Sequence, residues 1–291
     1  MKGDAAALAA RLRADGAFDE SFCDEACLNR YLRARNGDLD KAAAMVKATL
    51  EYRREHRIDE LSREEFAGSR FMRDGWVYVD GNDADGRSVV MFRKRRDKLP
   101  LAESDEYLRY MTFVIETAIK NMKHGAEQWV WVLDMTVYSP ANAPHLSTTL
   151  QVLQLLANHY PERLYKAYVV NAPTLFSVAW KVLHPFIDAV TRTKVEFVAT
   201  RDYHAPAKGA AAPAATWGAW ASSMLHAGGG SGSGKGAGAG SGSGVDAAVL
   251  VDDGPGAIVA GPGSFGPFVP CFDRPYDYDR HQAFLAACGW R

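Results

Sequence analysis

The chain has 291 residues, of which 47% are hydrophobic and 24% charged, and its net charge is −1. This composition is ordinary for a soluble globular protein, and the near-neutral charge argues against non-specific nucleic-acid binding. No apolar run reaches the roughly 18 residues of a membrane-spanning helix, and four cysteines are too few for a disulfide scaffold.

Residues 1–69 are predicted to be helical. The segment from Ala5 to Ala14 is rich in alanine, a strong helix former, and Asp24 is placed to cap a second helix. Gly37 then breaks the chain, and Asp38 or Asp40 opens a third helix. The apolar residues of this third helix share one face: Leu39, Ala42, Val46 and Leu50.

The pattern changes after residue 75. Trp76 to Val79 and Ser88 to Phe92 are typical of strands, and the turn between them is rich in Asp and Gly, so we predict a hairpin. A basic cluster, residues 93–96, follows the second strand. It is either a solvated strand exit or a contact for anionic lipid head groups at a membrane surface.

Helices and strands then alternate. Ser104 is placed to cap a helix, and Trp129 to Leu133 is a continuous apolar run that indicates a central strand. A helix from His145 to Tyr160 and a buried strand from Ala167 to Val170 follow. This alternation continues to about Val198 and predicts α/β packing with parallel strands.

The helix predicted from Thr174 to Leu183 has an unusually broad apolar surface. Apolar residues fall at helical spacing, and Phe176 and Trp180 widen the stripe. Pro185 ends the helix. A helix of this kind is either buried in a core or forms the wall or lid of a cavity for an apolar ligand.

Several motifs surround this helix in a fixed order: Tyr160 to Arg163 (Tyr-Pro-Glu-Arg), Val169 to Pro173, Pro185 to Asp188, and Thr191 to Lys194. In order and spacing they resemble the CRAL-TRIO family of lipid-binding proteins, and within it the phosphatidylinositol-transfer branch. The resemblance runs from about Asp24 to residue 203. It implies a helical N-terminal subdomain (1–69) and an α/β lipid-binding domain (70–203), with a mixed, mostly parallel sheet of about five strands, flanking helices and an apolar ligand cavity.

The last third of the chain lies outside this resemblance. Residues 228–244 are almost purely Gly, Ser and Ala, so we expect a flexible linker over residues 204–264. Residues 265–291 form an aromatic C-terminal segment. Its end, from His281 to Trp290, has the length of a short helix that would dock onto the domain, and the sequence leaves this docking open.

A buried phospholipid head group needs charge-matched donors and acceptors. Inositol hydroxyls suit a carboxylate such as Glu162, and a phosphate suits Lys194, Arg35 and the hydroxyl group of Thr191. The resemblance implies the same roles for these four residues and adds Asp188 as a hydroxyl contact. Taken singly, Glu162 and Lys194 would instead be interpreted as surface ion-pair partners.

The predicted cavity and lid consist of Trp129, Trp131, Leu175, Phe176, Val178, Ala179, Val182 and Phe186. The resemblance places small hydroxyl side chains of phosphatidylcholine-binding members where Trp129 and Trp131 stand. Indoles cannot make the same contact, so we expect phosphatidylinositol but not phosphatidylcholine to bind, beside an unknown second hydrophobic ligand. A basic position of the family beside Arg35 is Asn36 here, which weakens the expected phosphate site.

No nucleophile, metal or cofactor motif stands out. We therefore expect a non-enzymatic lipid-exchange protein without cofactor or metal. It would be a cytoplasmic monomer that contacts membranes transiently and binds no nucleic acid. Three alternatives stay open: a carrier of another apolar compound, such as a tocopherol- or retinoid-like molecule; an α/β enzyme that uses Asp134 with His159 or His184; and a scaffold that acts through residues 205–291.

Overall fold

A computed structural model describes residues 4–174, 176–199 and 276–290 of the chain. Its main elements are α1 (Ala5–Ala14), α2 (Glu25–Ala34), α3 (Leu39–Glu55), α4 (Arg70–Arg73), β1 (Val77–Asn82), β2 (Ser88–Arg93), α5 (Ser104–Asn121), β3 (Trp129–Asp134), α6 (Leu146–His159), β4 (Leu164–Val170), α7 (Phe176–Leu183), α8 (Ala189–Thr193), β5 (Val195–Val198) and α10 (Tyr278–Ala287). Short 3₁₀ turns are η1 (Ile58–Glu60), η2 (Glu64–Phe66), η3 (Leu101–Glu103), η4 (Pro140–Asn142) and η5 (His184–Phe186). The expected linker, residues 204–264, lies outside the described residues.

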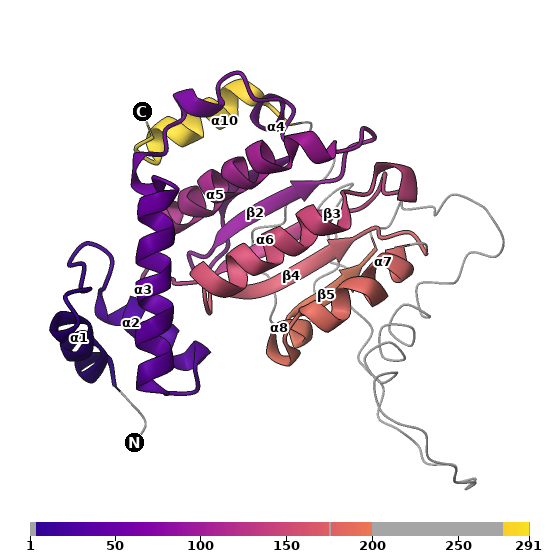
Figure 1. The fold of residues 1–291 in the computed structure, drawn as a ribbon. Coiled ribbons are helices and arrows are strands. Elements are labelled where there is room, and N and C mark those ends of the chain that lie inside the picture. Colours follow the sequence, from indigo (N-terminus) through magenta and orange to yellow (C-terminus); the bar gives the residue numbers. More distant parts are fainter. Residues whose placement is uncertain (1–3, 175, 200–275, 291) are drawn as a thin grey trace, which may run out of the picture.

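The first three helices form a small bundle with its own core (Figure 1). Each begins at an aspartate that accepts a hydrogen bond from a backbone N–H inside the first turn. The predicted cap Asp24 is confirmed, since its carboxylate accepts from the backbone N of Cys27 at 2.6 Å. Of the two candidates for the third helix, Asp38 is the cap. The bundle core is made of Leu8, Leu12, Leu28, Tyr31, Leu32, Ala42, Val46 and their neighbours.

A five-stranded sheet forms the centre of the lipid-binding part predicted from the sequence, with strand order β1-β2-β3-β4-β5. Strands β1 and β2 form the predicted antiparallel hairpin, and β2 to β5 run parallel. One row of paired residues crosses the parallel strands at Val90, Trp131, Ala167 and Val195. The predicted mixed, mostly parallel α/β fold is confirmed.

Side chains alternate between the two faces of this sheet because successive strand residues point in opposite directions. One face buries a compact apolar cluster: Val89, Met91, Val130, Val132, Tyr168 and Val170. The other face carries two clusters, one together with α5 and α6 and one beneath α7. These helices lie along the same side of the sheet (Figure 1).

Helix α5 begins differently from the prediction. Ser104 is its first helical residue rather than its cap, and Glu103 at the cap position makes no side-chain cap hydrogen bond. The hydroxyl group of Ser104 instead shares a 2.6 Å hydrogen bond with that of Thr148 on α6, and both residues are buried. The bond joins the starts of the two helices that lie side by side on the sheet.

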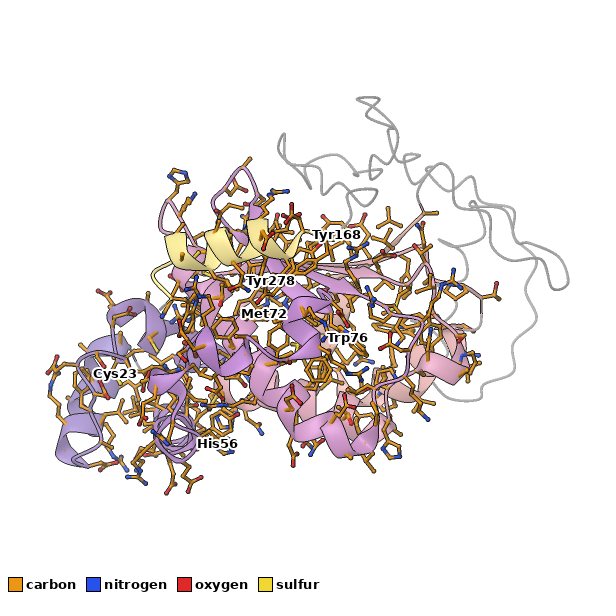
Figure 2. The ribbon with its side chains drawn as sticks, turned by 90° about the horizontal axis from the view of Figure 1, so that it is seen from above. Cys23, His56, Met72, Trp76, Tyr168 and Tyr278 are labelled. Atoms are coloured by element: carbon orange, nitrogen blue, oxygen red, sulfur yellow. The ribbon has the colours of Figure 1, made fainter. Side chains whose placement is uncertain are left out.

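Helix α10 docks onto the domain beside α4 and α5, although it comes from the far end of the chain (Figures 1 and 2). Leu285 is fully buried, and the Trp290 ring lies 4.6 Å from that of Phe113 on α5. Just before α10, the hydroxyl group of Tyr276 donates to the carbonyl oxygen of Met72 at 2.6 Å. The tyrosine ring approaches Gly75 so closely that a Cβ atom there would collide with it. The predicted end of the aromatic segment is therefore part of the core.

The N-terminal bundle is joined to the sheet part by polar contacts of low exposure. Arg53 of α3 lies 2.7 Å from the carboxylate of Glu116 on α5, and the hydroxyl group of Tyr160 donates to the same carboxylate at 2.8 Å. Arg30 of α2 pairs with Glu127, just before β3, at 2.8 Å. The bundle is thus fixed at the end of the sheet where the parallel strands begin.

Candidate functional site

An apolar cavity of about 440 Å³ lies between the sheet and the helices that cover it. Its floor is formed by β2 to β5, and its walls by α5, α6 and α7. The floor residues are Phe92, Trp131, Leu133, Leu164, Ala167, Val169 and Val195. This volume lies within the range of about 300–1,000 Å³ that is usual for small-molecule sites.

Helix α7 covers one side of this cavity with a two-sided surface. Phe176, Ala179 and Trp180 lie on its inner side and line the cavity. Val178 lies on the outer side, 61% exposed, and beyond the helix Phe186 is 58% exposed. Val182 lines the cavity and is also 44% exposed, so it lies at the rim. An amphipathic helix normally places polar residues toward solvent; α7 exposes Lys181 but also exposes Val178 and Val182.

The predicted cavity residues divide into three groups. Trp131, Phe176, Ala179 and Val182 line the cavity, whereas Val178 and Phe186 lie on the exposed side of the covering segment. The prediction for Trp129 is wrong: its indole is buried in the core near Tyr160, with ring centroids 6.4 Å apart, and does not reach the cavity. Leu175 lies outside the described residues.

The predicted head-group residues lie where the parallel strands begin. Glu162 precedes β4, and Lys194 precedes β5 and donates from Nζ to the carbonyl oxygen of Leu164 at 2.8 Å. Gln128, just before β3, donates to the carbonyl oxygen of Glu162 at 3.2 Å. Because β4 and β5 are neighbouring parallel strands, Glu162 and Lys194, which lie just before them, are at the same edge of the sheet.

The other three predicted head-group residues differ in their surroundings. Thr191 on α8 lines the cavity. Asp188 is the cap of α8, because its carboxylate accepts from the backbone N of Thr191 at 2.9 Å. Arg35 ends α2 and donates to the carbonyl oxygen of its neighbour Ala34 at 3.1 Å. No direct hydrogen bond or ion pair joins Arg35 to Glu162 or Lys194 in the described part of the chain.

Sequence reasoning did not predict that charged residues of the basic cluster line the cavity. Lys94 was recognised only as part of the basic cluster 93–96, yet it lines the cavity, and burial lowers its pKa from 10.5 to about 8. A signal was present: Val90, Phe92 and Lys94 have the spacing of two residues that places strand side chains on one face. Tyr107 of α5 also lines the cavity, and burial raises the pKa of its hydroxyl group above the ordinary range.

The three residues of the alternative enzymatic hypothesis do not form one site. Asp134 ends β3, and its carboxylate accepts from the backbone and hydroxyl groups of Thr136. His159 lies at the opposite edge of the sheet, stacked 4.0 Å from Tyr52 of α3, and burial lowers its pKa to about 4. His184 is in contact with Arg192 instead. This arrangement gives no support to an acid–base pair.

Two other kinds of site have no candidate within the described ranges. No helix there is long and apolar enough to cross a bilayer. No group of three or more His, Cys, Asp or Glu side chains there is arranged to hold a metal ion.

The sequence of the chain is similar to one family of known proteins. Residues 72–206 match the sequence model of the CRAL/TRIO domain. The protein named real-time from Aedes aegypti is 32% identical over 190 residues, which are 60% of this chain and 29% of that protein. A CRAL-TRIO domain-containing protein of Schizosaccharomyces pombe is 30% identical over 197 residues, 64% of this chain and 43% of that one. The chain therefore spans less than half the length of these curated relatives.

A solved structure supports the fold. The crystal structure of Sfh5 is similar with a TM-score of 0.51 at 19% identity, and the match covers 64% of this chain and 68% of that one.

Proposed function

Residues 72–206 match the sequence model of the CRAL/TRIO domain, and from this we propose that the protein belongs to that family, holds a lipid in the cavity and exchanges it at membranes without catalysing a reaction. The observation that carries the proposal is the apolar cavity beneath a helix that also exposes apolar side chains to solvent. Helix α7 contributes Phe176 and Ala179 to the cavity and presents Val178 to solvent. A monomer in transient contact with a membrane suits this arrangement.

The energetics of lipid transfer explain why such a helix is useful. Each methylene group that leaves water gains about 0.8 kcal/mol, so a long acyl chain will not cross water unprotected. A covering helix must be apolar inside to shield the chain. If its outer side is also apolar, movement into a membrane surface buries that side in lipid and favours opening of the cavity there. Val178 and Phe186 are the residues available for this contact.

We favour phosphatidylinositol as the lipid. In support, Glu162 and Lys194 lie at the start of the neighbouring strands β4 and β5, and Thr191 lines the cavity. An ammonium group and a hydroxyl group suit a phosphate, and a carboxylate suits inositol hydroxyls. Arg35 would approach from α2, which the pair between Arg30 and Glu127 holds at the same edge. Asn36 beside it supplies no further cation.

Phosphatidylcholine is expected to be excluded. The Trp131 indole occupies the floor of the cavity and packs against Phe92, with ring centroids 4.5 Å apart and ring planes tilted by 49°. A bulky ring there reduces the space for a choline head group and offers it no small hydroxyl contact. Phosphatidylcholine should therefore compete poorly for loaded phosphatidylinositol in a vesicle exchange assay. Efficient competition would contradict this assignment.

The test is native mass spectrometry of the full chain after incubation with mixed-lipid vesicles, followed by lipid extraction. We expect phosphatidylinositol on the wild type and its loss in Lys194→Ala. Lys166→Ala is the matched control, because Lys166 begins the same region of the sheet but pairs with Glu196 on the face away from the cavity. A different apolar molecule bound equally to all three proteins would support a carrier of another compound. Failure of every variant to take up any lipid would refute the proposed function.

A further inference from the structure

Lys94 is placed inside the cavity by the geometry of β2. Along this strand Val90 is buried in the core on the cavity side and Phe92 lines the cavity floor. The backbone N of Lys94 donates to the carbonyl oxygen of Asp134 at 2.9 Å, so the pairing with β3 continues one residue past β2. The alternation therefore sends Lys94 to the same face as Phe92.

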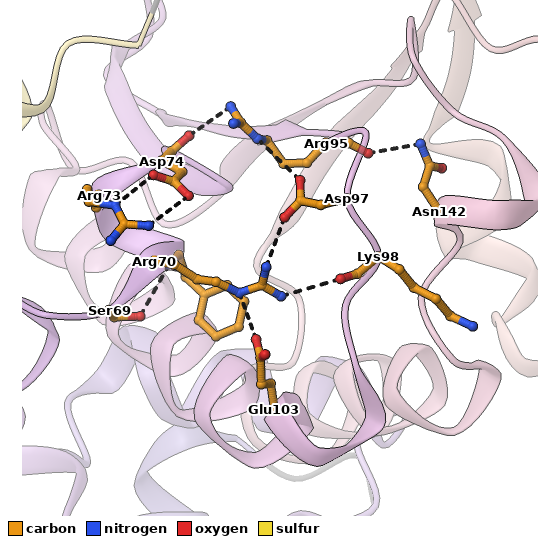
Figure 3. Close-up of polar contacts among 10 residues, drawn as sticks. Ser69, Arg70, Arg73, Asp74, Arg95, Asp97, Lys98, Glu103 and Asn142 are labelled. Atoms are coloured by element: carbon orange, nitrogen blue, oxygen red, sulfur yellow. Dashed lines mark hydrogen bonds and ion pairs between the residues drawn. The ribbon is translucent and has the colours of Figure 1, made fainter.

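The loop that carries Lys94 is held on two sides (Figure 3). From α4, the Arg70 guanidinium group donates to Glu103 at 2.7 Å and to Asp97 at 2.9 Å. From η4, the side-chain amide of Asn142 donates to the carbonyl oxygen of Arg95 at 2.9 Å. Lys94 adjoins this fixed segment, so its backbone has little freedom to carry the side chain out into solvent.

The Lys94 ammonium group has no direct ion-pair partner among the described residues. Its Nζ makes no hydrogen bond or ion pair with any residue of the described part of the chain. The acid that acts on it, Asp97, is already engaged by Arg70 and lies 3.8 Å from Arg95. The charged residues that line the cavity are all basic: Arg93, Lys94 and Arg95. No carboxylate is among the described lining residues.

An unpaired cation in an apolar cavity is costly, and a ligand anion would remove this cost. Burial lowers the pKa of Lys94, and Asp97 offsets this effect only in part. The hydroxyl group of Tyr107, which lines the same cavity without a hydrogen bond to any described residue, is a second donor.

From this geometry we infer that the cavity takes a second class of ligand, an apolar chain with one anionic head group that is held by Lys94. The inference rests on the proposed lipid-carrying function and names a ligand for the same cavity. The head group would lie at the opposite end from Lys194. By the strand register, Lys194 is level with Lys166, and Lys94 is level with Asn171. The distance along the strands between these two levels is about 16 Å, at roughly 3.3 Å per residue.

The experiment compares an anion with its neutral counterpart. Oleate and oleyl alcohol are titrated into the delipidated full chain, in the wild type, in Lys94→Met and in Lys98→Met. Lys98 is the matched control, because it is an exposed lysine of the same loop that does not line the cavity. The charge-assisted contact should make wild-type oleate affinity at least about tenfold higher than that of Lys94→Met. Oleyl alcohol should bind both proteins equally, and Lys98→Met should behave as the wild type.

Each other outcome has a defined meaning. Equal oleate affinity in the wild type and Lys94→Met overturns the inference but leaves the lipid carrier standing. Failure of both oleate and oleyl alcohol to bind the wild type counts against the proposed function itself. Lysophosphatidate serves as a third ligand: if its affinity depends on Lys94 more strongly than that of oleate, the head group is a phosphate rather than a carboxylate.

A measurement without any variant guards against misfolding of Lys94→Met. Carbon-13 NMR of carboxyl-labelled oleate bound to the wild type reports the pKa of the ligand's own carboxyl group. Contact with an ammonium group lowers that pKa below its ordinary value. An ordinary or raised value for the bound ligand would overturn the inference independently.

Discussion

The contact between Arg53 and Glu116 offers a quantitative test of how the N-terminal bundle is attached. Arg53 has a side-chain exposure of 14% and Glu116 of 11%, and their charged atoms lie 2.7 Å apart. Tyr160 donates to the same carboxylate. The perturbation is a double-mutant cycle of Glu116→Gln and Arg53→Met, which removes each charge while keeping much of the side-chain volume.

The expected magnitudes follow from the burial of both groups. Removal of one partner from a buried ion pair typically costs about 3–5 kcal/mol. Glu116→Gln should cost less, about 2 kcal/mol, because the amide oxygen still accepts hydrogen bonds. Arg53→Met should cost about 3 kcal/mol, because it leaves a buried carboxylate. The double variant should also lose about 3 kcal/mol, so the coupling energy is about 2 kcal/mol.

The assay is unfolding in guanidinium chloride, followed by tryptophan fluorescence and circular dichroism at pH 7. Arg54→Met is the control, because Arg54 neighbours Arg53 on α3 but is 77% exposed, and it should change the unfolding free energy by less than about 0.5 kcal/mol. If the losses of the two single variants add to within about 0.5 kcal/mol in the double variant, the pair contributes no coupling and the reasoning fails.

Three further predictions concern the core, the pH dependence and the membrane contact. Trp290→Ala should lower the unfolding free energy by about 3–5 kcal/mol, because it empties the space against Phe113; unchanged stability would show that α10 is not part of the core. His281 is buried, with its pKa lowered from 6.5 to about 4. The unfolded chain therefore binds a proton on this histidine below about pH 6.5, whereas the folded chain does not. Stability is then lost as pH falls from about 6.5 toward 4. Measured by denaturant titration, a drop from pH 7.5 to 5 should lower the unfolding free energy of the wild type by about 2 kcal/mol more than that of His281→Phe. Val178→Asp together with Phe186→Asp should weaken sedimentation with lipid vesicles at least about tenfold without unfolding the chain; undiminished binding would mean that another surface meets the membrane.

Local chemistry explains which parts of the fold the sequence predicts. Asp24 caps α2 through a contact three residues away, and the hairpin of β1 and β2 depends on its own turn. Ser104 failed as a predicted cap because a residue more than forty positions away, Thr148, engages its hydroxyl group. The docking of α10 is equally non-local, and no pattern within residues 278–287 identifies α5 as its partner.

The cavity shows the same division. Helical spacing predicts the inward side of α7, and strand alternation places Trp131 on the floor. The register of β3 changes between Trp129 and Val130, and Trp129 packs toward Tyr160 at the end of α6, which sequence spacing does not reveal. The place of Lys94 in the cavity could not be predicted without knowing which face of the sheet borders the cavity.

The position of α10 has a consequence for how the protein is made. The contact between Asn121 and Cys288 joins residues 167 positions apart in the sequence. At about 5–20 residues per second, a ribosome needs roughly 10–30 s to synthesise the chain between them. During that interval the apolar side of α5 has been translated, but the helix that will cover it has not. The nascent chain therefore completes this core only after α10 has left the ribosome, and until then α5 is a surface to which chaperones can bind.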